Sequence, residues 1–145
     1  MVIFPKTGFM ECAILIDDEF IFYDDGTFTI NTQGDVWAES YMQGNNECLL
    51  DGDLVAPFDV YGSGEHSFSA TGAEITVNGL GAYIGFNKAY NGVELPDDGS
   101  GTPASTITYE VYEYSDVDGI QRLTITVAYG SETDPDYWNM RMISE

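Results

Sequence analysis

Apolar and polar residues alternate along most of the chain, and this pattern predicts antiparallel β-strands. In residues 19–31 (EFIFYDDGTFTIN), aromatic and β-branched residues flank Asp25-Gly26, a pair typical of a hairpin turn. In that hairpin Phe20, Phe22 and Phe28 fall in strand register and are predicted core residues. The same pattern recurs in 66–79 around Thr71-Gly72, with Phe68 in register, in 105–130 around Asp118-Gly119, and in a closing strand over 136–144.

No stretch keeps a helical period over three turns. Residues 35–42 (DVWAESYM) have a shorter helical pattern, which predicts one or two helical turns with Asp35 as N-cap. Successive hairpins at this spacing predict an all-β fold, an antiparallel up-and-down meander that either closes as a barrel or folds as a β-sandwich. At 145 residues we expect a single domain, 1–145.

Two long segments, 35–64 and 79–105, interrupt the meander and are predicted to be irregular. Within the second, residues 79–95 (GLGAYIGFNKAYNGVEL) are too rich in glycine for a helix. We expect a strand over 81–86, with glycines on the face of Tyr83 that leave room for a ligand or a neighbouring backbone. An Asn91-Gly92 turn follows, and Lys88 is predicted either to pair with a carboxylate such as Glu94 or to donate to a ligand oxygen.

The charge is strongly negative. Four Lys and Arg face 25 Asp and Glu, for a formal net charge of −21. Such a surface repels phosphate backbones and anionic lipid, so we expect no nucleic-acid partner and no membrane insertion, while neutral ligands and cations remain open. The first ten residues lack the features of a signal peptide, so an exported form would be a mature fragment of a longer protein.

The two cysteines, Cys12 and Cys48, leave two interpretations open. One is a disulfide in an oxidising compartment, which would stabilise the fold by roughly 3–4 kcal/mol. The other is a pair of buried free thiols.

Catalytic chemistry is poorly supported by the sequence. Carboxylate pairs are expected by chance in so acidic a chain, and most sit at turns, where Asp is favoured for backbone reasons. His66, the only histidine, opens a predicted strand with Ser67 on the opposite face, so no triad is indicated. We expect no enzyme and no resident cofactor. Calcium shared among Asp51, Asp53 and Asp59 is the one metal hypothesis left open.

The aromatic residues are the most informative class. Several lie outside clean strand register, and sugars present C–H faces that stack on such rings while carboxylates, amides and lysine bond their hydroxyls. The alternative is that these rings plug the ends of a barrel. The set comprises Trp37, Tyr41, Tyr61, Tyr83, Phe86, Tyr90 and Trp138.

Taken together, several segments resemble the lipocalin-like β-domains of secreted Bacteroidetes proteins, which are found appended to polysaccharide-utilisation surface proteins or carbohydrate-active enzymes. The resemblance runs from about Cys12 to the end of the chain, and its most specific parts are the DDEF…DGTF hairpin and GAYIGFNKAYNGVEL. Further matching parts are a Trp, Cys48, HSFSATGAEITVNG, ITYEV and YWNMRMI.

This resemblance implies a lipocalin-like barrel, an extracellular or outer-membrane-surface location, other domains of a larger protein as partners, and a Cys12–Cys48 disulfide. It also implies a non-catalytic module that binds a neutral poly- or oligosaccharide. The alternatives are a structural or protein-interaction domain without a small ligand, and a barrel with an apolar cavity, which the bulky inward side chains argue against. The expected binding residues are Trp37, Tyr83, Tyr90 and Trp138 for stacking, and Asp35, Glu39, Asn87 and Lys88 for hydroxyls.

Overall fold

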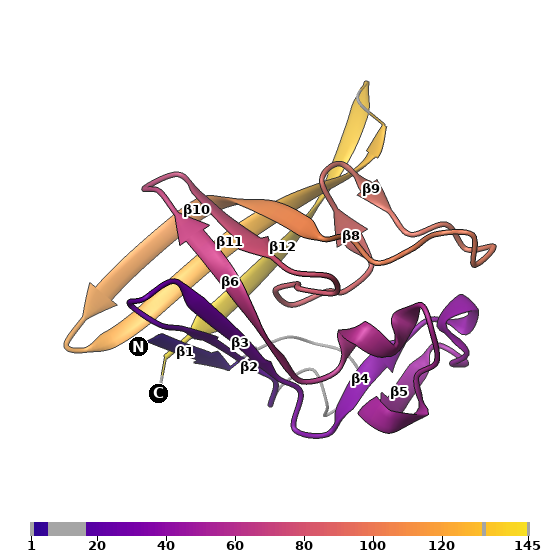
Figure 1. The fold of residues 1–145 in the computed structure, drawn as a ribbon. Coiled ribbons are helices and arrows are strands. Elements are labelled where there is room, and N and C mark those ends of the chain that lie inside the picture. Colours follow the sequence, from indigo (N-terminus) through magenta and orange to yellow (C-terminus); the bar gives the residue numbers. More distant parts are fainter. Residues whose placement is uncertain (1, 6–16, 132, 145) are drawn as a thin grey trace.

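The computed structural model describes residues 2–5, 17–131 and 133–144, with only the backbone for 2–5, Ser131 and Pro135. Eight antiparallel strands form the main sheet, and each is hydrogen-bonded to the next in one continuous order (Figure 1). In that order they are β1 (Val2–Pro5), β2 (Glu19–Phe22), β3 (Thr27–Asn31), β6 (Gly64–Ala70), β7 (Glu74–Asn78), β10 (Thr106–Val117), β11 (Ile120–Ser131) and β12 (Asp134–Ile143).

The sheet curls into a half-barrel. Its edge strands, β1 and β12, come near each other without hydrogen-bonded pairing. The predicted all-β antiparallel meander is therefore confirmed. The predicted core residues Phe20, Phe22 and Phe28 are buried and Phe68 is half-buried, so the apolar face of the alternating pattern lines the inside of the curl.

The three predicted hairpins are present. In the β2–β3 turn, Gly26 has a φ of +89° and the backbone N–H of Thr27 donates to Asp25 Oδ1 at 2.9 Å. In the β6–β7 turn, Thr71 Oγ1 accepts from the N–H groups of Ala73 and Glu74. Asp118 and Gly119 both adopt positive φ, as a tight turn of the type I′ class requires.

The first insertion, between β3 and β6, corrects the prediction for 35–42. Residues Asp35–Ala38 form a strand, β4, which pairs with β5 (Glu47–Leu50). Val36 and Ala38 are buried while Trp37 between them is half-buried, so the period is two and no helix is N-capped by Asp35. Only short 3₁₀ helices follow: η2 (Ser40–Met42), η3 (Asp51–Asp53) and η4 (Phe58–Tyr61).

The second insertion, between β7 and β10, corrects the predicted strand over 81–86. This stretch is an irregular buried loop, because Gly81 and Gly85 have φ of +80° and +76°, which a strand does not tolerate. The backbone N–H of Ile84 donates to the Tyr109 hydroxyl at 2.9 Å, which ties the loop to β10. The loop then enters a small hairpin, β8 (Ala89–Tyr90) and β9 (Val93–Glu94).

The β8–β9 turn lies beside the portion of β10 that is not paired with β11. The pairing of β10 with β11 begins at Glu110 and Thr126, which leaves the start of β10 unpaired on that side. Asn91 fills this gap, since its side chain donates to Thr106 O at 2.7 Å and accepts from Thr108 N at 3.1 Å. The N–H of Gly92 donates to Ala128 O of β11. The predicted Asn91-Gly92 turn is thus confirmed, and it carries the preceding loop across one end of the half-barrel.

Both insertions lie toward one end of the curled sheet, whereas the turns of β2–β3, β6–β7 and β10–β11 lie toward the other (Figure 1). We call these the closed end and the open end. Across the described part of the chain, no helix has the length and apolar character needed to cross a bilayer.

Candidate functional site

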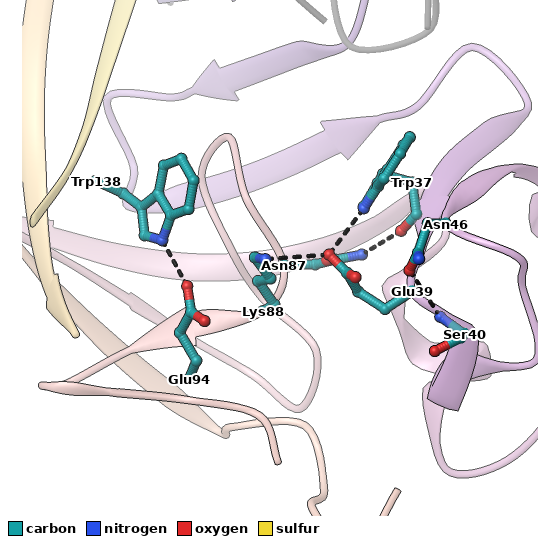
Figure 2. Close-up of polar contacts among 8 residues, drawn as sticks. All are labelled: Trp37, Glu39, Ser40, Asn46, Asn87, Lys88, Glu94 and Trp138. Carbon is teal, nitrogen blue, oxygen red and sulfur yellow. Dashed lines mark hydrogen bonds and ion pairs between the residues drawn. The ribbon is translucent and has the colours of Figure 1, made fainter. Parts of the chain in front are cut away.

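The closed end gathers polar and aromatic side chains from four separate parts of the sequence. We call this group the indole cluster, and it consists of Trp37, Glu39, Asn87, Lys88, Glu94 and Trp138 (Figure 2). β4 and its C-terminal end contribute Trp37 and Glu39, the loop before β8 contributes Asn87 and Lys88, β9 contributes Glu94 and β12 contributes Trp138. The β8–β9 hairpin is anchored on β10 and β11. It therefore brings the loop before β8 and strand β9 against Trp138 of β12.

One half of the cluster centres on a single carboxylate oxygen. Glu39 Oε1 accepts from Trp37 Nε1 at 2.9 Å and lies 3.2 Å from Lys88 Nζ. The side chains of Lys88 and Glu39 are only 20% and 16% exposed, so solvent screens this ion pair less than a surface pair. The backbone after Glu39 is also held, because Ser40 N donates to Asn46 Oδ1. The Trp37 indole is therefore fixed at its polar edge.

The other half centres on Trp138. Its Nε1 donates to Glu94 Oε1 at 2.7 Å. The indole is stacked with Phe86, at 5.0 Å between ring centroids and 4° between planes, and with Tyr129, at 5.5 Å and 25°. Lys88 Nζ lies 5.5 Å from the centroids of both Phe86 and Trp138, a cation–π distance.

The cluster retains hydrogen-bonding capacity. Glu39 and Glu94 each use one carboxylate oxygen for the bonds above and keep a second acceptor oxygen. Lys88 carries three N–H donors, and Glu39 is its one ion-pair partner among the described residues. Nearby, burial raises the pKa of Tyr41 far above its ordinary value, and the charges of Glu39, Asp97 and Glu94 add to the effect, so this hydroxyl stays protonated. Two carboxylates around one lysine give the site a net negative charge that favours neutral or cationic ligands.

Asn87 braces the site. It is 4% exposed, and its Nδ2 donates to Trp37 O at 3.0 Å, which joins the loop to β4. Its Oδ1 is buried without a hydrogen-bond partner in the described part of the chain. A ligand would not reach this amide directly, so the arrangement assigns Asn87 to positioning Trp37 rather than to the predicted bonding of hydroxyls.

Tyr83 does not belong to the cluster. It is 2% exposed and packs edge-on against Phe20 and Tyr61, at centroid distances of 6.0 and 5.7 Å. The space beside Gly81 is also occupied, because a Cβ there would overlap the carbonyl oxygen of Val60. Gly81 thus admits a neighbouring backbone rather than a ligand, and the prediction of Tyr83 as a stacking platform is wrong for this structure.

Two further predicted residues lie apart from the indoles. Asp35 stands at the start of β4, and burial, followed by the charges of Asp17 and Asp51, raises the pKa of its carboxyl. Its Oδ1 is buried with no partner recorded in the described segments. Tyr90 on β8 is half-buried and packs against the core. Within the described residues, neither makes a hydrogen bond, ion pair or ring-stacking contact with Trp37 or Trp138.

The cysteine and calcium predictions remain predictions. Cys48 lies in β5 opposite Trp37, but Cys12 falls outside the described residues. Asp51 and Asp53 are in η3 and Asp59 in η4, and Asp51 accepts from Thr32 Oγ1 and Ser63 N. Over the described ranges, no group of three or more His, Cys, Asp or Glu is arranged to hold a metal ion.

Sequence reasoning missed an aromatic ring that packs on the cluster and the partner of Lys88 within it. Tyr129 was not a candidate, although Val127 pairs with Trp138 and Tyr129 lies two residues further along the same strand face. That register could have indicated it. Lys88 was expected to pair with a carboxylate such as Glu94, but its partner is Glu39, and Glu94 holds the indole of Trp138 instead.

Comparison with known proteins adds no relative. No protein-family model, no curated protein and no solved structure matches this chain.

Proposed function

We propose that this protein is a non-catalytic carbohydrate-binding module and that the indole cluster binds a neutral poly- or oligosaccharide. The proposal rests on one arrangement: both tryptophans of the chain lie at the closed end, and each indole N–H is held by a carboxylate. A sugar ring stacks on Trp37, whose ring has no recorded stacking partner in the described segments, while Glu39, Glu94 and Lys88 bond its hydroxyls.

Pre-organisation supports this role. A ring that is already hydrogen-bonded at its N–H loses little rotational freedom when a ligand binds, so more of the stacking energy remains as affinity. The charge supports selection of neutral glycans, because uronic acids would meet Glu39, Glu94 and an overall charge of −21.

Intrinsic fluorescence tests the proposal directly, because the only two tryptophans report from the cluster itself. We expect neutral polysaccharides, screened as mixed-linkage β-glucan, xyloglucan, galactomannan and starch, to include one that shifts or quenches the emission saturably. Polygalacturonate and alginate serve as acidic counterparts and should have no effect. Affinity electrophoresis on the same panel provides a second readout.

Variants locate the site. Trp37→Ala should weaken binding of the responding glycan about tenfold or more, as expected for a stacking anchor, while Trp37→Phe should retain most of the affinity. Tyr137→Ala is the matched control, since Tyr137 is an exposed aromatic residue beside Trp138 on the same strand. Unchanged binding by a folded Trp37→Ala protein would refute the assignment.

A structural or protein-interaction domain is the second candidate. It is favoured by the stacking of Trp138 with both Phe86 and Tyr129, which is what a plug of the closed end would require. If no glycan in the panel binds, and Trp138→Phe lowers the unfolding midpoint without any other effect, this second role is the better account.

We further propose that the domain works at an extracellular or bacterial outer-membrane surface, as part of a larger protein, with Cys12 and Cys48 joined by a disulfide. Thiol alkylation of the unfolded, unreduced protein followed by intact-mass measurement tests the bridge. Two alkyl adducts per chain would contradict it, while adducts only after reduction would support it.

A further inference from the structure

The open end of the half-barrel holds a pocket that the proposed function does not use. Its volume is about 540 Å³. The walls are mainly apolar and come from the concave side of the sheet, with turn residues at the rim. The apolar lining consists of Phe22, Phe68, Ala70, Ile75, Val111 and Leu123.

The pocket exists because the connections at this end are short. The β2–β3 and β6–β7 strands are joined by tight turns, and both turns contribute to the rim, through Gly26 and Gly72. At the closed end, by contrast, the β8–β9 segment and the loop before it lie across the sheet. The sequence argued against a large cavity inside a barrel, but at the open end a pocket remains, and Phe22 and Phe68 form one of its walls, edge to face at 5.0 Å.

We propose that this pocket binds an uncharged, largely apolar small molecule that carries a hydrogen-bond acceptor at one end. The volume lies within the usual range of roughly 300–1,000 Å³ for small-molecule sites. Small-molecule binding sites are usually apolar pockets with a few polar groups, and this pocket has its polar groups at the rim.

Tyr114 supplies the polar contact at the rim. Its ring lines the pocket but is 55% exposed, and its hydroxyl accepts from Gln121 Nε2 at 3.2 Å. Because the hydroxyl oxygen already accepts, its proton is available to donate to a carbonyl, ether or hydroxyl oxygen of the ligand.

Charge decides against an anionic ligand. Asp24 lines the rim, and Gln121 also donates toward Asp116 Oδ2 at 3.4 Å, which places a second carboxylate beside Tyr114. With the net charge of −21, a carboxylate or sulfonate head group would be repelled. This distinguishes the proposed ligand from a fatty acid.

Two naphthyl fluorophores that differ by a sulfonate test the proposal on the intact protein. We expect N-phenyl-1-naphthylamine, which is neutral, to show saturable fluorescence enhancement with one site per chain. Its anionic counterpart, 1-anilinonaphthalene-8-sulfonate, should bind at least tenfold more weakly at low salt. Equal or tighter binding of the sulfonate would overturn the choice of ligand class.

Glycine substitutions provide a matched pair. Gly72 at the rim and Gly52 in η3 both have ordinary φ and open space where a side chain would be added. Gly72→Phe should weaken binding of the neutral probe at least tenfold, and Gly52→Phe should leave it unchanged. Ala70→Phe is a second blocking variant, and near-UV circular dichroism checks each fold. Absence of saturable binding, or binding that survives both blocking variants, would overturn the proposal.

Discussion

The two ends of the half-barrel use the same sheet in opposite ways. At the closed end, two insertions bring a buried loop, two small hairpins and an array of paired polar groups over the core. At the open end, tight turns leave an apolar pocket of about 540 Å³. In an up-and-down meander, strand connections occur at both ends of the sheet. The two ends therefore differ because the connections at one end are long, and not because the strands differ.

Glycine shows the contrast most clearly. Gly81 and Gly85 at the closed end have positive φ, and an added Cβ would contact Val60 or lie 2.6 Å from Met140 Cγ. Gly72 at the open end has neither constraint. Gly81 and Gly85 therefore serve close approach at the closed end, whereas Gly72 lies in an open-end turn that imposes neither constraint.

We expect the largest effect on the free energy of unfolding from replacing the closed-end glycines with alanine. Gly81→Ala combines a left-handed backbone with overlap against a main-chain carbonyl, so we expect a loss of about 3 kcal/mol or more in the free energy of unfolding. Gly72→Ala should change it by less than about 1 kcal/mol, in the stabilising direction. Urea denaturation followed by circular dichroism measures both. Similar effects at the two glycines would remove the distinction between the ends.

The turns offer the next test. Asn91→Ala removes two hydrogen bonds to β10 and places alanine at a φ of +47°, so we expect a loss of about 2 kcal/mol. Thr71→Ala also removes two hydrogen bonds, but these lie within an exposed turn, and we expect about 0.5–1 kcal/mol. Hydrogen exchange should show the loss of protection around Thr106 and Thr108 only in the first variant. Protection that persists there would mean that Asn91 does not anchor the hairpin.

The sequence predicted the open end better than the closed end. Asp25-Gly26, Thr71-Gly72 and Asp118-Gly119 are local signals, because each turn directly joins two strands that pair with each other. The closed end depends on contacts between distant segments. In a strand over 81–86, Tyr83 would share one face with Gly81 and Gly85, but packing against Val60 and Met140 requires a different backbone.

The same reasoning explains the candidate site. Aromatic residues out of strand register pointed to Trp37 and Trp138, and both lie in the indole cluster. Nothing local distinguished them from Tyr83, which the same criterion selected but which lies in the core. The identity of each carboxylate partner depends on the fold, so pairing Lys88 with Glu39 rather than Glu94 could not be read from spacing.

A double-mutant cycle measures how strongly the cluster is coupled. Lys88→Met and Glu39→Gln should each lower the free energy of unfolding, with a coupling of about 1 kcal/mol, because the pair is partly buried and shares its oxygen with Trp37. Tryptophan emission of Glu39→Gln should shift as the Trp37 bond weakens. Additive effects would show that Lys88 interacts mainly with the rings of Phe86 and Trp138.

The smallest effect is a difference in the sign of pH dependence between the ends. At the closed end, burial and then the charges of Asp17 and Asp51 raise the pKa of Asp35, so the folded state disfavours its ionisation. Stability from this group is present below its unfolded pKa, near 3.8, and is lost as the pH rises through the raised value. Asp35→Asn should therefore stabilise the protein slightly at pH 7, and this gain should disappear below about pH 4.

At the open end, hydrogen bonds from Thr27 lower the pKa of Asp25, so its contribution is present at neutral pH and is lost as the pH falls below 3.8. Asp25→Asn should accordingly destabilise slightly at pH 7, opposite in sign to Asp35→Asn. Urea midpoints of both variants from pH 3 to 7 compare the two directly. Because each substitution removes one carboxylate from the same acidic chain, general relief of repulsion shifts both midpoints upward by a similar amount. The difference in urea midpoint between the two variants therefore reports the local environments of Asp35 and Asp25. A difference that does not change with pH would contradict the opposite pKa shifts of these two carboxyl groups.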